Sequence, residues 1–155
     1  MTVIRDLFRW NFILMTAITG WFTAQVAKTI VNCILMHRFE IERMWGDGGM
    51  PSAHSATVCA MLVAAARLEG TDSAIFAVAS VVAIITMHDA MGVRRETGKQ
   101  ARILNQMLTE WIEMGARSTP ILADKKLKEM VGHTPIEVIS GAALGALVGW
   151  VIPLV

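Results

Sequence analysis

Gly48-Gly49-Met50-Pro51-Ser52-Ala53-His54-Ser55-Ala56 opens the second of several apolar segments in this chain of 155 residues. Glycine and proline are frequent in loops, and the apolar residues after His54 indicate that a helix starts here. The first turn of a helix has backbone N–H groups without partners inside the helix, so it suits a phosphate. A second stretch of this kind, Gly132-His133-Thr134-Pro135-Ile136-Glu137, opens the last apolar segment. The sequence therefore predicts two helix starts that each carry a histidine.

The apolar segments set the expected architecture. The chain is 54% hydrophobic and only 17% charged, whereas soluble domains carry about 25% charged residues. Four segments are near the length of about 20 residues that crosses a bilayer, and they cover residues 12–36, 53–68, 73–91 and 135–155. We expect an all-α fold, a polytopic integral membrane helix bundle that forms one domain over residues 1–155. The net charge of +1 gives no indication of nucleic-acid binding.

Residues 92–132 differ from the rest of the chain because these 41 positions hold 13 of its 27 charged residues. Residues 101–114 place apolar side chains on one helical side, a pattern typical of an amphipathic helix. Residues 122–131 follow Pro120 and predict a second short helix. We expect this segment to lie at the membrane interface or to cover the helix bundle.

Small residues mark the last segment, where Gly141, Gly145 and Gly149 recur every fourth position. This spacing lets the backbone of a neighbouring helix approach closely. It predicts close helix packing, and it also makes a homodimer the expected assembly.

The basic residues predict the orientation. With four spans, residues 37–50 and 92–132 lie on the same side of the membrane and carry ten Lys and Arg, against three on the other side. Positive charge collects on the cytoplasmic side of membrane proteins. We expect an integral membrane protein, in a bacterial inner membrane, whose candidate site faces the cytoplasm.

The two histidines suggest phosphoryl transfer. His133 and Glu137 are spaced i, i+4, so the carboxylate can accept from the imidazole ring and fix its tautomer. The other ring nitrogen is then free to attack phosphorus, and His54 can serve as the general acid for the leaving group. No cluster of Cys and His indicates a metal site.

Basic residues complete the candidate site. Lys28, Arg94 and Arg95 are expected to neutralise the phosphoryl oxygens. A lysine inside an apolar segment is costly unless it meets an anion, so Lys28 is a functional candidate. Gln25 and Asn32 share its helical face at positions i−3 and i+4.

Further residues are expected to support the site. Asp89 precedes the two arginines and is predicted to orient one of them. The run Arg94–Asn105 is predicted to close in part over the phosphate, and its spacing leaves open which residues do so.

At these motifs the chain resembles the divergent membrane branch of the type-2 phosphatidic acid phosphatase superfamily. Pro51-Ser52-Ala53-His54 is similar to its Pro-Ser-Gly-His motif, and His133-x3-Glu137 is similar to the end of its last motif, with Glu for Asp. The resemblance implies that Ser52 binds phosphate, that His54 is the acid and that His133 forms a phosphohistidine. It also implies that the reaction needs neither a metal nor another cofactor.

The resemblance extends to other residues. Lys28 is similar to the lysine of the first motif, and Lys99 and Asn105 lie in stretches that match the branch. The superfamily has an arginine six residues before the nucleophilic histidine, where this chain has Leu127. We expect Arg94 or Arg95 to replace it.

The sequence therefore favours a membrane enzyme that hydrolyses a lipid phosphomonoester, such as phosphatidylglycerophosphate or phosphatidic acid, at the bilayer surface. Two alternatives stay open. One is a non-catalytic protein that binds anionic lipid or conducts an anion past Lys28. The other is a lipid phosphotransferase, in which a lipid alcohol takes the phosphoryl group.

Overall fold

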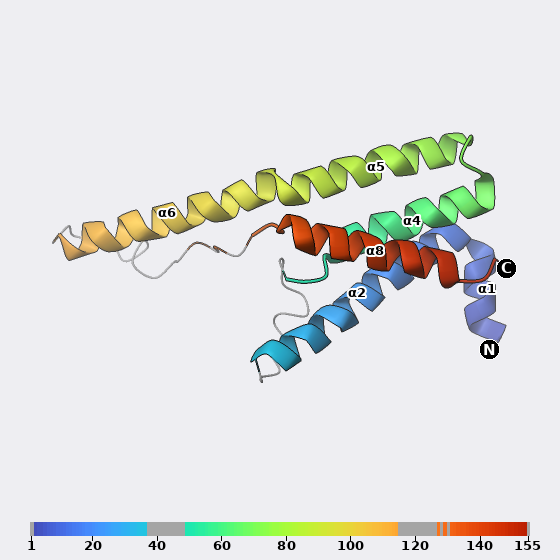
Figure 1. The fold of residues 1–155 in the computed structure, drawn as a ribbon, viewed down its shortest axis with the longest axis horizontal. Coiled ribbons are helices and arrows are strands. Elements are labelled where there is room, and N and C mark those ends of the chain that lie inside the picture. The colour runs from blue at the N-terminus through green and yellow to red at the C-terminus, as the bar shows by residue number, and fades with distance from the viewer. Residues whose placement is uncertain (1, 37–48, 115–126, 128, 130, 155) are drawn as a thin grey trace.

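The structure, a computed structural model, describes residues 2–36, 49–114, 127, 129 and 131–154. These residues form helices and connecting turns without any strand (Figure 1), so the predicted all-α fold is confirmed. The helices are α1 (Thr2–Trp10), α2 (Phe12–Met36), α4 (Ala53–Glu69), α5 (Ala74–Met91), α6 (Val93–Glu113) and α8 (Pro135–Val151).

The four apolar segments become helices α2, α4, α5 and α8, with boundaries close to those expected from the sequence. Local polar side chains explain where three of them start. Ser52 accepts from the backbone N–H of Ser55 at α4, and Ser73 accepts from that of Phe76 at α5. Thr134 starts α8 with a capping box, in which two otherwise unpaired backbone donors are satisfied. Only α8 differs clearly in length, since it ends at Val151 rather than at residue 155.

Helix α4 lies at the centre of the bundle, in contact with α2, α5 and α8. Four of its alanines, Ala56, Ala60, Ala64 and Ala65, are fully buried, and the glycines of α8 allow a close approach. A Cβ atom at Gly145 would run into the backbone carbonyl of Ala56, and one at Gly149 would lie 2.9 Å from that of Ala60. The regular glycine spacing therefore serves packing within the chain. The expected homodimer stays a prediction, without this spacing as its support.

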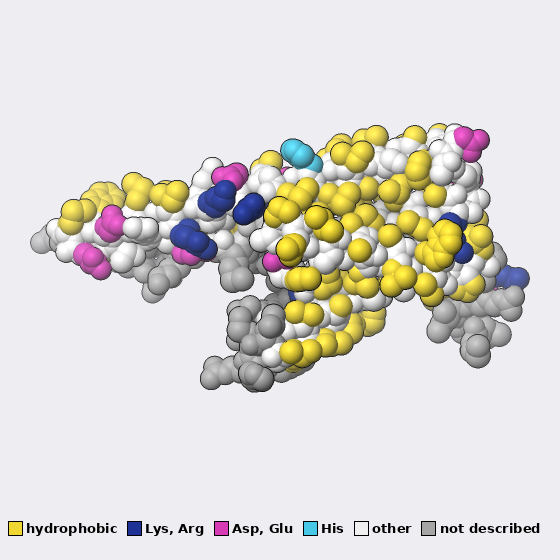
Figure 2. Space-filling view, in the orientation of Figure 1, with side chains coloured by type: hydrophobic (Ala, Val, Ile, Leu, Met, Phe, Trp, Pro, Cys, Tyr) yellow, Lys and Arg dark blue, Asp and Glu magenta, His cyan; other side chains and the backbone are white. Residues whose placement is uncertain are grey.

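Hydrophobic side chains cover much of the face of the bundle seen in Figure 2. Exposed large hydrophobic side chains recur every fourth residue along α2, at Leu14, Ile18, Phe22, Val26, Ile30 and Ile34. Exposed apolar patches of this extent mark contact with a membrane or with another protein.

One helix among the described residues is long and apolar enough to cross a membrane, the continuous stretch Ala74–Glu113 formed by α5 and α6. Helix α8 is apolar but shorter, and α2 carries the polar residues Gln25 and Lys28 in its middle. The expected count of four spans is therefore not confirmed. The predicted orientation also stays a prediction, because residues 37–48 and 115–126, with many of the basic residues that were counted, lie outside the described residues.

Helix α6 is longer than the amphipathic helix expected at residues 101–114, and it continues α5 beyond the end of the bundle (Figure 1). Its buried residues are Gly98, Ala101 and Asn105. A Cβ atom at Gly98 would lie 2.6 Å from the carbonyl oxygen of Glu129, so the chain before α8 runs directly along α6.

The short helix expected at residues 122–131 is wrong at the three of these positions that the structure describes. Leu127, Glu129 and Val131 are not helical, because hydrogen bonds from Asn105 tie this stretch to α6 instead. The described residues Leu127, Glu129 and 131–134 are called the strap; the remaining positions of the expected helix lie outside the described residues.

Candidate functional site

His133 lies at the end of the strap, where two hydrogen bonds hold it in place. Its backbone N–H donates to the carbonyl oxygen of Ala90 at 3.0 Å, and its Nδ1 lies 3.1 Å from Glu137 Oε2. The same carboxylate oxygen accepts from the backbone N–H of Thr134 at 3.0 Å. The expected contact between His133 and Glu137 is therefore present. A proton shared at Nδ1 leaves Nε2 as the nitrogen with a free lone pair.

His54 lies beside His133, as the two motifs led us to expect. It sits in the first turn of α4, and the two rings are 6.0 Å apart between centroids, edge to face at 63°. His133 is 4% exposed, whereas His54 is exposed. One histidine is thus held rigidly, and the other faces outward next to it.

A backbone contact explains why the two histidines meet. The N–H of Ser52 donates to the carbonyl oxygen of Glu137 at 2.9 Å, which joins the start of α4 to the first turn of α8. The side chain of Ser52 is fully buried. Its hydroxyl caps α4 and accepts from Ser55 Oγ at 3.1 Å. In this structure Ser52 therefore joins the two helix starts, and it does not line the pocket beside them.

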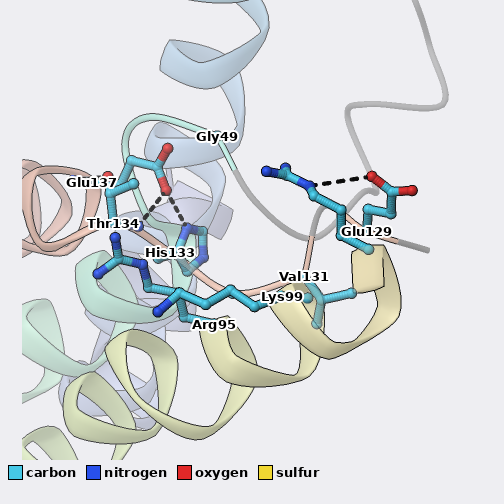
Figure 3. Close-up of a pocket in the computed structure, with 11 residues that line it drawn as sticks. Gly49, Arg95, Lys99, Glu129, Val131, His133, Thr134 and Glu137 are labelled. Carbon is cyan, nitrogen blue, oxygen red and sulfur yellow. Dashed lines mark hydrogen bonds and ion pairs between the residues drawn. The ribbon is translucent and has the colours of Figure 1, made fainter. Parts of the chain in front are cut away.

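A pocket of about 290 Å³ opens between the strap and α6 (Figure 3). His133, Thr134 and Glu137 line one part of it, and Gly49 lines another. The basic side chains of α6 line the facing wall, at Arg95, Lys99 and Arg102. His54, Lys28 and Arg94 are not part of the lining.

The neighbouring residues Arg94 and Arg95 lie in different surroundings. Arg94 Nε lies 2.8 Å from Asp89 Oδ2, so the expectation that Asp89 orients an arginine agrees with this geometry. Arg95 lines the pocket and makes no ion pair with any residue that the structure describes. Arg95 is therefore the arginine of this pair that is placed to meet an anion beside His133.

Lys28 lies next to Gly49, which lines the pocket, but it is not part of the lining itself. It is only 7% exposed, and its methylene groups pack on the backbone of Gly49, within 4.0 Å of where a Cβ atom would lie. Gly49 has a φ of +88°, which favours glycine. The amide oxygen of Gln25, one turn away, is buried without a hydrogen bond in the described part of the chain. Asn32, the third member of this face, is partly exposed.

Asn105 holds the strap. Its Nδ2 donates to the carbonyl oxygen of Leu127, and its Oδ1 accepts from the Leu127 N–H, both at 2.9 Å. Its Nδ2 also donates to Glu129 Oε1 at 2.9 Å. The side chain of Leu127 is exposed, so this position supplies nothing to the pocket. Asn105, which was expected near the phosphate, instead fixes the wall that carries Glu129.

Two charged residues that line the pocket, Arg102 and Glu129, were not among the site residues predicted from the sequence. Arg102 follows Arg95 and Lys99 at the i+7 position of one helical face, and this spacing could have revealed it. Glu129 had no such signal, because its place depends on Asn105, which lies 24 residues earlier.

Replacing Asn105 should loosen the strap. We expect Asn105→Ala to speed hydrogen exchange at the Leu127 amide by roughly tenfold to a hundredfold. Loss of the hydrogen-bond partner of a buried group costs about 1–3 kcal/mol. Each 1.4 kcal/mol changes the equilibrium constant for local opening by about a factor of ten. Exchange mass spectrometry on the full chain in detergent measures this. Gln106→Ala, on the exposed side of the same helix, is the control, and equal protection in both variants would contradict the role of Asn105.

The sequence of the chain matches a known family. Residues 9–148 match the model of the Divergent PAP2 family, and the chain belongs to that family. It is similar to a curated protein of Bacillus subtilis (strain 168), called the uncharacterized membrane protein YuiD, with 39% identity over 143 residues. That match covers 88% of this chain and 90% of the relative. No solved structure matches the chain.

Proposed function

We propose that this protein is a membrane phosphatase that hydrolyses a lipid phosphomonoester through a phosphohistidine at His133. The observation that carries the proposal is the buried His133, whose Nδ1 lies 3.1 Å from Glu137 Oε2, with the exposed His54 ring beside it. A nucleophile oriented by a carboxylate and paired with a second acid–base group is the arrangement that covalent catalysis needs.

The first step forms a bond between His133 Nε2 and phosphorus and breaks the bond from phosphorus to the lipid oxygen. The proton on His54 passes to that oxygen, so a lipid alcohol leaves. In the second step His54 takes a proton from water, whose oxygen attacks phosphorus. The N–P bond breaks and inorganic phosphate is released. Glu137 keeps the proton on Nδ1 of His133 throughout and stabilises the ring while it carries positive charge.

Positive charge on the pocket wall supports the same proposal. The phosphoryl oxygens hold negative charge during the transfer, so fixed cations accelerate it. Arg95 lines the pocket beside His133, and we assign it this role. Lys28, Arg94 and Ser52 remain candidates behind this first contact, and Lys99 adds charge further along α6.

A location in the membrane is part of the proposal. The exposed apolar faces of the bundle and the name of the relative from Bacillus subtilis support it. Apart from Gly49, the residues that line the pocket belong to the first half of α6, the strap and the start of α8. These segments lie at the end of the bundle where α6 begins (Figure 1), a place that a lipid phosphate at the bilayer surface can reach. We propose the cytoplasmic surface, from the count of basic residues, and the inner membrane of a bacterium.

Phosphate release from a panel of lipid phosphates tests the function. The purified full chain, in detergent micelles without added divalent metal, should release phosphate from at least one of them, and vanadate should inhibit the release. Absence of release from every lipid phosphate would overturn the proposal. Supplying a lipid alcohol and analysing the products separates hydrolysis from transfer, since a phosphotransferase would phosphorylate that alcohol.

The two arginines give a matched test of the charge on the wall. Arg95→Ala should lower kcat/KM by about 10²-fold to 10³-fold, as loss of a group that stabilises the developing charge does. Arg94→Ala should cost less than about tenfold, because Arg94 is paired with Asp89 outside the pocket. Steady-state kinetics on the preferred lipid measures both. A larger loss in Arg94→Ala would show that the assignment of the two residues is reversed.

A non-catalytic anion-binding protein is the second candidate, and the buried Lys28 favours it. This function predicts that phosphate or vanadate raises the unfolding temperature of the full chain while no lipid phosphate is turned over. The same purified protein thus distinguishes the two candidates.

A further inference from the structure

The basic side chains of α6 continue along the pocket beyond the end where His133 lies (Figure 3). Arg95, Lys99 and Arg102 occupy positions i, i+4 and i+7 and line the same pocket. At 1.5 Å per residue, Lys99 is about 6 Å and Arg102 about 10 Å along the helix from Arg95. Figure 2 shows the basic side chains gathered over the first half of α6, where it leaves the apolar bundle. Of these three residues, the proposed function assigns Arg95 to the phosphate beside His133.

The pocket also has more room than one phosphate fills. Its volume of about 290 Å³ is close to the lower end of the range for small-molecule sites, roughly 300–1,000 Å³. One water takes about 30 Å³ in the liquid. A phosphate, with five heavy atoms, therefore fills only part of the pocket. The free space lies along the row of basic residues, between α6 and the strap (Figure 3).

The ion pairs of this row leave it able to bind a further anion. Lys99 Nζ pairs with Glu96 Oε1 at 2.6 Å, and both side chains are more than half exposed, so the pair contributes little and can exchange. Arg102 Nε lies 3.4 Å from Glu129 Oε2. This contact uses one edge of a guanidinium that carries five N–H donors.

The strap gives this part of the pocket a fixed wall. Asn105 Nδ2 holds Glu129 Oε1 at 2.9 Å while Arg102 contacts the other carboxylate oxygen. Glu129 thereby orients Arg102, and it is itself placed by a buried residue of α6. Arg102 and Glu129 were not among the site residues predicted from the sequence, whereas Asn105 was.

We propose that Lys99 and Arg102 form a second anion subsite, so that the preferred ligand is a lipid carrying two phosphate groups joined by a short linker. One phosphate lies against His133 and Arg95, and the other lies further along α6. This inference rests on the proposed function for its account of the first phosphate. It adds a subsite that discriminates against lipids with a single phosphate.

Binding of non-hydrolysable phosphonates tests the subsite without turnover. Isothermal titration of the full chain in detergent should show propane-1,3-diphosphonate binding at least tenfold more tightly than methylphosphonate. In the Lys99→Gln, Arg102→Gln double variant this ratio should fall below about threefold. Arg9→Gln removes an exposed charge on α1 and should leave the ratio as in the wild type. A ratio near one in the wild type, or an undiminished ratio in the double variant, would overturn the proposal.

Two further measurements complete the test. The first distinguishes a lipid ligand from a water-soluble one, and the second distinguishes the second anion subsite from the proposed phosphatase function. An alkyl chain added to the diphosphonate should tighten binding if the ligand is a lipid, and equal affinity would overturn that part of the inference. Phosphate release from single-phosphate lipids together with a ratio near one would leave the proposed function standing without the second subsite. A high ratio without release from any lipid phosphate would leave the subsite standing and reject the enzyme.

Discussion

His133→Ala should reduce phosphate release by at least about a thousandfold and abolish any phosphorylated intermediate. The physical reason is that the step at His133 is covalent, and loss of a nucleophile removes the whole route rather than one contribution to it. Rapid quenching of the wild type with a ³²P-labelled lipid phosphate should trap acid-labile label on the protein. The variant should trap none.

The matched control is His88→Ala. His88 is an exposed histidine of α5 outside the pocket, so its removal should change the rate by less than about threefold. Thermal unfolding and helical circular dichroism of both variants check that the fold is kept. Undiminished release in His133→Ala with a folded protein would rule out His133 as the nucleophile, and His54 would then have to be tested in its place.

Gly145→Leu should destabilise the bundle by roughly 3 kcal/mol or more, at or beyond the upper end of the usual cost of overpacking. Even a Cβ atom at this position would run into the carbonyl oxygen of Ala56, and that oxygen belongs to the backbone of the central helix. Helix α8 would have to move away from α4. Because α8 carries Glu137 in its first turn, its displacement would also separate Glu137 from the chain around Ser52.

Unfolding by heat or denaturant in detergent measures the loss. Ala143→Leu, on the exposed side of the same helix, adds a larger side chain toward the outside and should cost less than about 0.5 kcal/mol. Equal stability of the two variants would mean that α8 does not pack on α4 through its glycines.

The helices could be predicted well because their causes are local. The apolar residues from Phe12 to Met36 and the start at Ala53 follow from composition and from neighbouring residues. The same holds for the contact between His133 and Glu137, since an i, i+4 spacing places both on one side of a helix turn. The helix expected at residues 122–131 was wrong at its described positions. Asn105, more than 20 residues earlier, binds the backbone N–H and carbonyl oxygen of Leu127, and in a helix these groups would bond within the helix instead.

The sequence by itself determined that the chain forms apolar helices and that two of them start with a histidine. Only the tertiary structure decided which residues share the pocket. Arg95 lines it while Arg94 turns to Asp89, although the two are adjacent, because successive residues on a helix point about 100° apart. Ser52, expected at the phosphate, is buried as the cap that joins α4 to α8. Such choices depend on which helix faces meet, and close packing between distant segments sets those faces rather than any local pattern of residues.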